Sequence, residues 1–272
     1  MPKFDINNFV IDRVRRGVMF STDNGEALWS LTQVEDPSLK MTSETGEAVD
    51  ALGSTIMQFD RSKACEFSGS NSLFDLSLLA AQSGTEKQIA ATDKKLTMEM
   101  FEEIEIPADG TTVTLKKTPI GTGAAGIPFI YKLKGDSTFI EKFEYGSDDA
   151  TKQFTFSGTT LTFPTSLEAG DEIFVSYSYE ADGSEGNGGV IVENNATEFA
   201  KAGKFVMEVI GCDVCNASKK YFAYVVLPQA KLKSDFDLSF KVDGKHPFAI
   251  EAMQQYCDRK KKLFYIAIPE MD

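Results

Sequence analysis

FVMEVI-GCDVCNASKK-YFAYVVLP, residues 205–228, is the stretch that decides the class of fold. Residues 205–210 are apolar on both alternating faces, apart from Glu208, and residues 221–227 are similar and are expected to end at Pro228. Short runs rich in β-branched and aromatic residues are typical of deeply buried strands. The polar residues between them indicate a turn, so this stretch predicts two buried strands.

Further strands are predicted downstream. Apolar residues alternate cleanly with polar ones over 236–243, which predicts a strand with one solvated face. Residues 248–253 also fit a short helix, but we favour a strand. Residues 263–268 predict the final strand, which Pro269 ends.

The N-terminal part adds a hairpin and a helix. Asn24-Gly25 between two apolar runs predicts a hairpin, and residues 54–68 are consistent with a half-buried strand. A short helix is predicted over about 72–83, with Asn71-Ser72 as its N-cap and Gly84 as its C-terminal stop. Its broad apolar side should lie across a sheet.

The middle of the chain has a different pattern. Residues 98–106 alternate with period two, and their carboxylates predict an acidic outer face. Short strands separated by turns follow, and such spacing is typical of an antiparallel sandwich. These strands are 111–115, 127–133, 139–145, 154–156, 161–163 and 173–179. The glycine-rich stretches 121–126 and 182–189 are interpreted as linkers or hairpin tips, because no phosphate-loop or calcium-loop pattern surrounds them.

Composition narrows the function classes. The chain of 272 residues has 28 Lys and Arg against 41 Asp and Glu, a formal net charge of −13. This charge disfavours binding to nucleic acid phosphates. No apolar run is long enough to cross a membrane, and the first residues lack a secretory signal, so we expect a protein made inside a cell. The whole pattern predicts a structural or binding protein with no enzymatic activity, no metal and no cofactor.

Reactive side chains are few. His246 is the single histidine, and His246-Pro247 predicts a surface imidazole in a turn. Cys65, Cys212, Cys215 and Cys257 are interpreted as reduced thiols. Cys212 and Cys215 form a CxxC motif, but no second pair or histidine pair at matched spacing supports a zinc site.

Basic residues Arg13, Arg15 and Arg16 precede the predicted hairpin. They could form a solvated arm, or an extended arm that pairs with acidic surface on a neighbouring copy, and the sequence leaves both interpretations open. Trp29, the only tryptophan, is expected in the core rather than at an interface.

The order of these segments resembles a known family. Gly17-Val18-Met19-Phe20, the element 68–84 and the block 221–231 together resemble the major tail, or tail tube, proteins of tailed bacteriophages. The resemblance covers residues 1–106 and 186–272, and residues 107–185 resemble an inserted immunoglobulin-like β module. It implies a mainly β fold: an antiparallel β-sandwich or barrel of tail-tube type with one short flanking helix, plus a second, smaller β-sandwich.

The resemblance also implies a function. Such proteins form six-membered rings that stack through an N-terminal arm and a long loop into a hollow tube, which passes DNA without binding it specifically. The implied partners are further copies of the chain and other tail proteins, with no membrane. The implied location is the virion tail, assembled in the bacterial host cytoplasm.

Acidic residues suit such a lumen, because repulsion would keep DNA moving. Glu99, Glu103 and Glu105 are candidates for lumen-facing acids, although ordinary solvated charge also explains them. Two other functions remain open: a head decoration or auxiliary capsid protein, and a glycan-binding module that uses exposed aromatic residues of 127–145. A hydrolase is disfavoured, because no GxSxG motif or convergent pair of carboxylates is evident.

Overall fold

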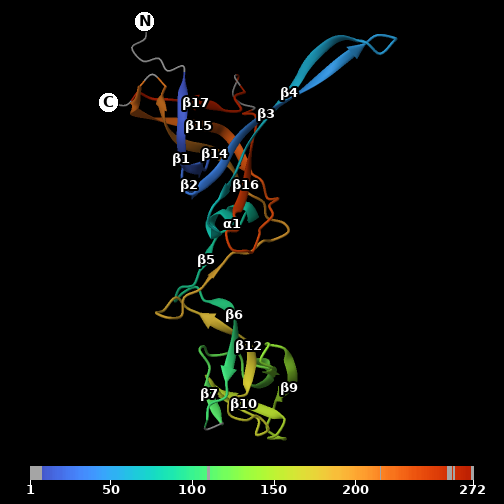
Figure 1. The fold of residues 1–272 in the computed structure, drawn as a ribbon, viewed down its shortest axis with the longest axis vertical. Helices are drawn as coiled ribbons and strands as arrows, with labels where there is room; N and C mark the ends of the chain where they lie inside the picture. The colour runs from blue at the N-terminus through green and yellow to red at the C-terminus, as the bar shows by residue number, and fades with distance from the viewer. Residues whose placement is uncertain (1–7, 109–110, 215, 256–258, 260, 271–272) are drawn as a thin grey trace. The chain divides into compact units, whose positions relative to one another are not determined.

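The computed structural model describes residues 8–108, 111–214, 216–255, 259 and 261–270. The chain divides into two compact units, one formed by Met1–Lys87 with Val192–Asp272 and the other by Gln88–Ile191. We call them unit 1 and unit 2. Both are built from β-strands, and the described residues contain one α-helix (Figure 1). The predicted mainly β, antiparallel fold with a single helix is confirmed.

Unit 1 is a sheet of eight strands. They are β1 (Phe9–Phe20), β2 (Ala27–Leu31), β3 (Val34–Val49), β4 (Thr55–Asn71), β14 (Ala202–Asp213), β15 (Asn216–Leu232), β16 (His246–Ala252) and β17 (Tyr265–Ala267). The order is β2-β1-β14-β15-β16-β4-β3, with β17 also paired to β15. Only two residues join β2 to β3, which lie at opposite ends of this order. The sheet must therefore curl until its two ends meet, as in a barrel.

The curled sheet encloses an aromatic core. Phe67 lies between Phe205 and Phe248, with ring centroids 5.5 and 5.9 Å away. Trp29 is 7% exposed and packs on Phe205, which confirms its predicted place in the core. The hairpin at Asn24-Gly25 is also confirmed, because β1 pairs antiparallel with β2.

Helix α1 (Leu76–Ser83) begins later than predicted. Its N-cap is Asp75, whose Oδ1 accepts hydrogen bonds from the amides of Ser77 (2.7 Å) and Leu78 (3.2 Å). A carboxylate that satisfies the first amides fixes the start of a helix, so the predicted cap at Asn71-Ser72 is wrong. Gly84 ends the helix at φ +74°, as predicted.

His246 corrects another prediction. It is 1% exposed and begins β16 rather than lying on a surface turn. Its Nδ1 accepts a 3.4 Å hydrogen bond from the Asp75 amide, and its Nε2 lies 2.7 Å from Oε1 of Gln82. This pattern requires a neutral imidazole that donates from Nε2. Burial lowers the pKa of His246, and the charge of Asp75 opposes this shift.

Two details of the C-terminal strands also differ from the prediction. Residues 236–243 form no strand, and Phe240 and Val242 are 88% and 89% exposed. Alternation alone does not supply a neighbouring strand with which to pair. Pro228 does not end its strand either, because β15 continues to Leu232. The register between β14 and β15 shifts at this point, and this shift accommodates Pro228, which lacks an amide hydrogen. The strand preferred over a helix at 248–253 is confirmed as part of β16.

Unit 2 contains the short strands predicted for the middle of the chain and two further strands, β5 and β13, that the sequence did not predict. They are β5 (Gln88–Ile89), β6 (Leu96–Glu105), β7 (Thr112–Thr114), β8 (Phe129–Leu133), β9 (Phe139–Tyr145), β10 (Gln153–Ser157), β11 (Thr160–Thr162), β12 (Glu172–Ala181) and β13 (Val190–Ile191), with a 3₁₀ turn at Gly123–Ala125. Seven strands follow the order β6-β12-β8-β9-β10-β11-β7. Pairing is antiparallel except between β9 and β10. The first and last strands of this order, β6 and β7, are neighbours in sequence, so this sheet also folds back over its own core.

In the sequence, unit 2 begins at Gln88 and ends at Ile191, whereas the inserted module was expected over 107–185. Strand β6 pairs with β12 along Leu96–Glu105, so it belongs to unit 2. The short pair β5–β13 also lies in unit 2, where Ile89 is opposite Val190. The change of sequence pattern near residue 107 therefore falls inside unit 2, after its first long strand.

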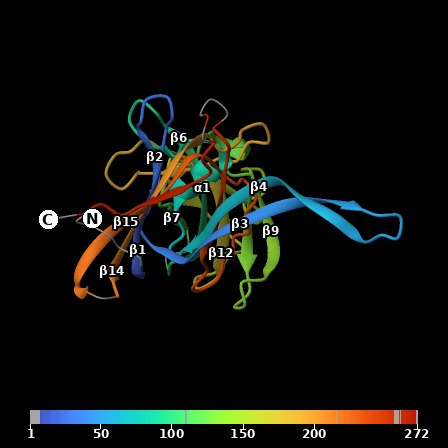
Figure 2. The same ribbon diagram turned by 90° about the horizontal axis from the view of Figure 1, so that it is seen from above.

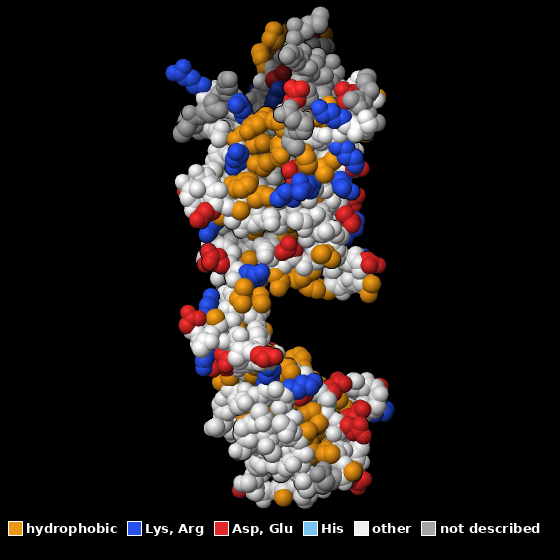
Figure 3. Space-filling view, turned by 90° about the vertical axis from the view of Figure 1, so that its left-hand side faces the viewer, with side chains coloured by type: hydrophobic (Ala, Val, Ile, Leu, Met, Phe, Trp, Pro, Cys, Tyr) orange, Lys and Arg blue, Asp and Glu red, His pale blue; other side chains and the backbone are white. Residues whose placement is uncertain are grey.

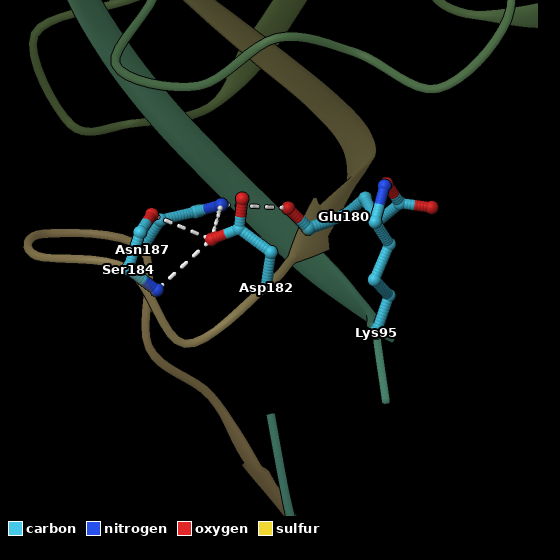
Figure 4. A network of polar contacts seen from close by, with 5 residues as sticks. All are labelled: Lys95, Glu180, Asp182, Ser184 and Asn187. Atoms are coloured by element: carbon cyan, nitrogen blue, oxygen red, sulfur yellow. Dashed lines mark hydrogen bonds and ion pairs between the residues drawn. The ribbon is translucent and has the colours of Figure 1, made fainter. Parts of the chain in front are cut away.

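The glycine-rich stretch 182–189 is a closed turn held by one carboxylate (Figure 4). Oδ1 of Asp182 accepts hydrogen bonds from the amide of Ser184 (3.0 Å), its hydroxyl (2.6 Å) and the side-chain amide of Asn187 (2.9 Å). The bonds from Ser184, followed by that from Asn187, lower the pKa of Asp182 to about 2. Beside the turn, Lys95 forms an ion pair with Glu180.

Candidate assembly surfaces

The most distinctive surface of unit 1 is the hairpin formed by β3 and β4. Residues 66–71 at its base pair with β16, whereas residues 55–65 pair with β3 alone in the described structure. Beyond the base the hairpin projects away from the rest of unit 1 (Figure 2). A two-stranded ribbon with no third layer leaves both of its faces and both outer edges open for contact.

Large apolar side chains lie exposed along this hairpin. Met41, Val49, Leu52, Ile56, Met57 and Phe59 are exposed by 45, 56, 92, 67, 53 and 51%, respectively. A cluster of exposed apolar residues of this kind marks a surface that contacts another molecule. The sequence predicted a half-buried strand over 54–68, but only its C-terminal part is buried, as at Phe67.

The tip of the hairpin is a defined turn. Oδ1 of Asp50 accepts hydrogen bonds from the amides of Leu52 (2.9 Å) and Ser54 (2.8 Å). Gly53 has φ +85°, a conformation that glycine adopts without strain. The turn therefore holds Leu52 outward at the tip in a fixed position.

Arg13, Arg15 and Arg16 lie in β1, a strand of the chain's own sheet, rather than in a separate arm. Arg15 Nη1 and Arg16 Nε lie 3.5 and 2.9 Å from Oε2 of Glu208. Glu208 is 9% exposed and also accepts a hydrogen bond from the Tyr224 hydroxyl. Burial, followed by the charge of Glu208, raises the pKa of Tyr224. Arg15 and Arg16 thus neutralise the buried carboxylate of Glu208. A contact of the three arginines with a neighbouring copy stays a prediction.

Strand β1 also has an open edge. It pairs with β2 only over Gly17–Phe20, whereas residues 9–16 pair with β14 on one side and with no other described strand. Open edges can add a strand from another chain.

Hydrophobic side chains also gather, among lysines and arginines, on the face of unit 1 that is seen in Figure 3.

Glu99, Glu103 and Glu105 all lie exposed on the outer face of β6, as the alternation predicted. The hydroxyl of Ser178 donates a 3.0 Å hydrogen bond to Glu99. Their place in a lumen stays a prediction.

Sequence reasoning gave no role to Glu102, which breaks the apolar alternation of β6. It is 4% exposed and accepts hydrogen bonds from the Tyr177 hydroxyl and the Lys116 amide. Burial, followed by the bond to Glu102, raises the pKa of Tyr177. The only signal in the sequence was this single carboxylate on an apolar face, and a polar residue at such a position needs buried partners.

Few other features among the described residues suggest a ligand, metal or catalytic site. A cavity of about 330 Å³ lies beside α1 in unit 1 and is lined by residues that include Trp29, Ala80, Lys87 and Lys201. Across the described ranges, no group of three or more metal-binding side chains occurs, and no helix could span a membrane. Cys65 and Cys212 are free thiols, and burial raises the pKa of Cys65. Cys215 and Cys257 lie outside the described residues, so the CxxC interpretation stays a prediction.

Comparison with known proteins adds one match. No curated protein matches the chain. The model of the YomU/Tube protein family matches residues 9–266, which include β1, the β3–β4 hairpin and unit 2. Since this match spans nearly the whole chain, the protein belongs to the YomU/Tube protein family.

Proposed function

We propose that this protein is a non-enzymatic structural subunit of a phage tail tube. Copies assemble into hexameric rings, and the rings stack into a hollow tube through which DNA leaves the virion. The partners are further copies of the chain and other tail proteins. The subunits assemble in the cytoplasm of the bacterial host, and unit 2 corresponds to an immunoglobulin-like insertion in the tube-forming unit.

The observation that carries this proposal is the β3–β4 hairpin. It exposes apolar side chains along a ribbon that has no support from its own unit. In an isolated subunit this exposure is unfavourable by roughly 25 cal/mol per Å² of apolar area. Burial against a neighbouring copy removes that cost. Membership of the YomU/Tube protein family supports the same conclusion, since tube formation requires contacts between copies.

A contact from the hairpin of one copy to a different surface of the next is heterologous. Such contacts form a ring when the rotation closes and a filament when it does not. The open edge of β1 along residues 9–16 offers a second contact of this kind. Two independent heterologous contacts suffice for both a ring and a stack of rings.

Negative-stain electron microscopy of the purified full chain tests the proposal. We expect rings with a central hole, or tubes built from them, at high protein concentration. Particles that stay monomeric at every concentration would contradict it, and a monomer that binds only preformed capsids would favour a head decoration protein instead.

Electrostatics gives a second test. The formal net charge of −13 per subunit disfavours contact with DNA phosphates. We therefore expect no measurable binding of the assembled tubes to duplex DNA at physiological salt. Replacing Glu99, Glu103 and Glu105 with lysine should create binding that weakens with salt if these residues face the lumen or another surface open to DNA.

A further inference from the structure

The outer face of the unit 2 sheet carries a continuous row of aromatic rings. Phe101 on β6 contacts Phe174 on β12 at 5.4 Å between ring centroids, and Phe174 contacts Phe139 on β9 at 5.1 Å. Tyr131 on β8 continues the row, 4.8 Å from Phe139. Phe101 and Phe139 are 67% and 53% exposed. We call these four residues the aromatic row.

This face does not serve the core of unit 2. The residues that fill the core alternate with the aromatic row along the same strands, for example Ile173 and Val175 on either side of Phe174. The outer face of an antiparallel sheet is usually polar. Exposed rings that touch one another across four strands therefore indicate a surface for a partner.

Carboxylates border the aromatic row. Glu103 is directly opposite Phe174 in the β6–β12 register, and Glu105 is directly opposite Glu172. Like charges that face each other across two strands destabilise a sheet. This arrangement favours a partner that brings positive charge, because a cation between two carboxylates relieves their repulsion.

The same face already holds one cation in this way. The Lys142 ammonium lies 4.4 Å from the centroid of the Phe129 ring and 3.0 Å from Oε1 of Glu144. An aromatic ring and a carboxylate thus bind the same ammonium group. The aromatic row with Glu103 offers the same two elements, and Glu103 has no ion pair among the described residues.

The ion pairs described in unit 2 do not include Glu103, Glu105 or Glu172. The lysines of unit 2 with described ion pairs are already matched, as Lys95–Glu180, Lys132–Asp171 and Lys142–Glu144. The exposed carboxylates of Glu103, Glu105 and Glu172 give this face a local negative charge, which a positively charged segment complements. The occupant is therefore a segment of opposite charge.

We propose that the outer face of β6, β12, β8 and β9 binds a segment of another protein that is rich in lysine or arginine. The guanidinium or ammonium groups stack on the aromatic row, and Glu103, Glu105 and Glu172 pair with them. This role is separate from tube formation, so either can fail without the other.

Fluorescence anisotropy of the full chain with a labelled peptide of alternating arginine and glycine, at about 0.15 M salt, tests the proposal. A peptide with citrulline in place of arginine keeps the shape and removes the charge. We expect saturable binding of the arginine peptide and at least tenfold weaker binding of the citrulline peptide.

Three variants separate specific binding from attraction by net charge. Phe101→Ser with Phe139→Ser removes two exposed rings and keeps every charge, and should weaken binding about 5- to 30-fold. Glu103→Gln with Glu105→Gln and Glu172→Gln should weaken it at least about threefold. The control removes the same number of charges from exposed turns of unit 2 (Asp93→Asn, Asp148→Asn, Glu168→Gln) and should change binding less than about twofold. Circular dichroism verifies that each variant is folded.

Several outcomes would overturn the proposal. One is equal weakening by the control variant and the sheet charge variant, with no effect of the ring variant. Others are equal binding of the two peptides, no binding at all, and displacement of the peptide by a neutral oligosaccharide such as cellohexaose, which would assign the face to a glycan.

Discussion

His246 joins two elements of unit 1 that are far apart in sequence. Its two ring nitrogens contact the N-cap residue of α1 and Gln82 near the end of the same helix, while its backbone begins β16. The side-chain amide of Gln82 also donates to the Pro247 carbonyl. The helix is thus held against the sheet by a small buried network that works only with a neutral imidazole.

This network predicts a pH dependence. Burial lowers the pKa of His246 in the folded state below its ordinary value of about 6.5. The unfolded chain then binds more protons between these two pKa values. The stability from the neutral imidazole is full above about pH 6.5 and is lost as the pH falls towards the folded pKa.

Urea unfolding between pH 8 and pH 5 measures this effect, with His246→Gln as the comparison. The wild-type protein should lose more stability on acidification than the variant over this range. At pH 8 the variant should be less stable by about 1–3 kcal/mol, because it disturbs buried hydrogen bonds. Parallel pH profiles of the two proteins would contradict the proposed role.

Glu102 and Tyr177 give a second prediction at the residue scale. Tyr177→Phe removes a donor from a carboxylate that is 4% exposed, which should destabilise unit 2 by about 1–3 kcal/mol. Tyr179→Phe, two residues along the same strand, is the matched control and should have a smaller effect. Thermal unfolding of the two variants makes the comparison. Equal effects would show that the bond to Glu102 adds no stability.

At the scale of elements, the β3–β4 hairpin separates folding from assembly. Its distal part contributes no residue to the buried core of unit 1, which draws only Phe67 from β4. The core should therefore form without the distal half of the hairpin.

Leu52→Asp tests this separation. Leu52 is 92% exposed at the tip, so the substitution should change the free energy of unfolding by less than about 0.5 kcal/mol. It should nevertheless reduce assembly strongly, because a buried charge without a partner is unfavourable in an interface. Sedimentation velocity measures the assembly. Leu28→Asp in β2, also exposed but outside the hairpin, is the control.

Particular elements show what the sequence could and could not predict. The strands of unit 2 were predicted because one face is buried, which imposes a period of two. Gly84 was predicted as a helix stop because its role is local. The exposed β3–β4 hairpin was not predicted, because the sequence pattern around Ile56 and Phe59 is the same whether their own chain or another molecule covers them. His246 was misplaced because a His-Pro pair suits a turn, and only the tertiary structure supplies Asp75 and Gln82 as partners.

At the scale of the whole molecule, the two units have separate cores. The core of unit 1 contains no residue of unit 2, and Ile89 is directly opposite Val190 where unit 2 begins and ends. Replacing residues 90–189 with a short Gly-Ser linker should therefore leave a cooperatively folded unit 1. Circular dichroism and thermal unfolding measure this. A molten product would show that unit 1 depends on unit 2 for its folding.

The central claim is that the β3–β4 hairpin joins one subunit to the next in a tube. Cryo-electron microscopy of assembled tubes, with helical reconstruction, measures this directly. We predict that residues 40–64 lie against a neighbouring subunit, and that this subunit covers the side chains of Leu52 and Phe59. Tubes in which this hairpin lies free in solvent, or particles that never assemble, would contradict the claim.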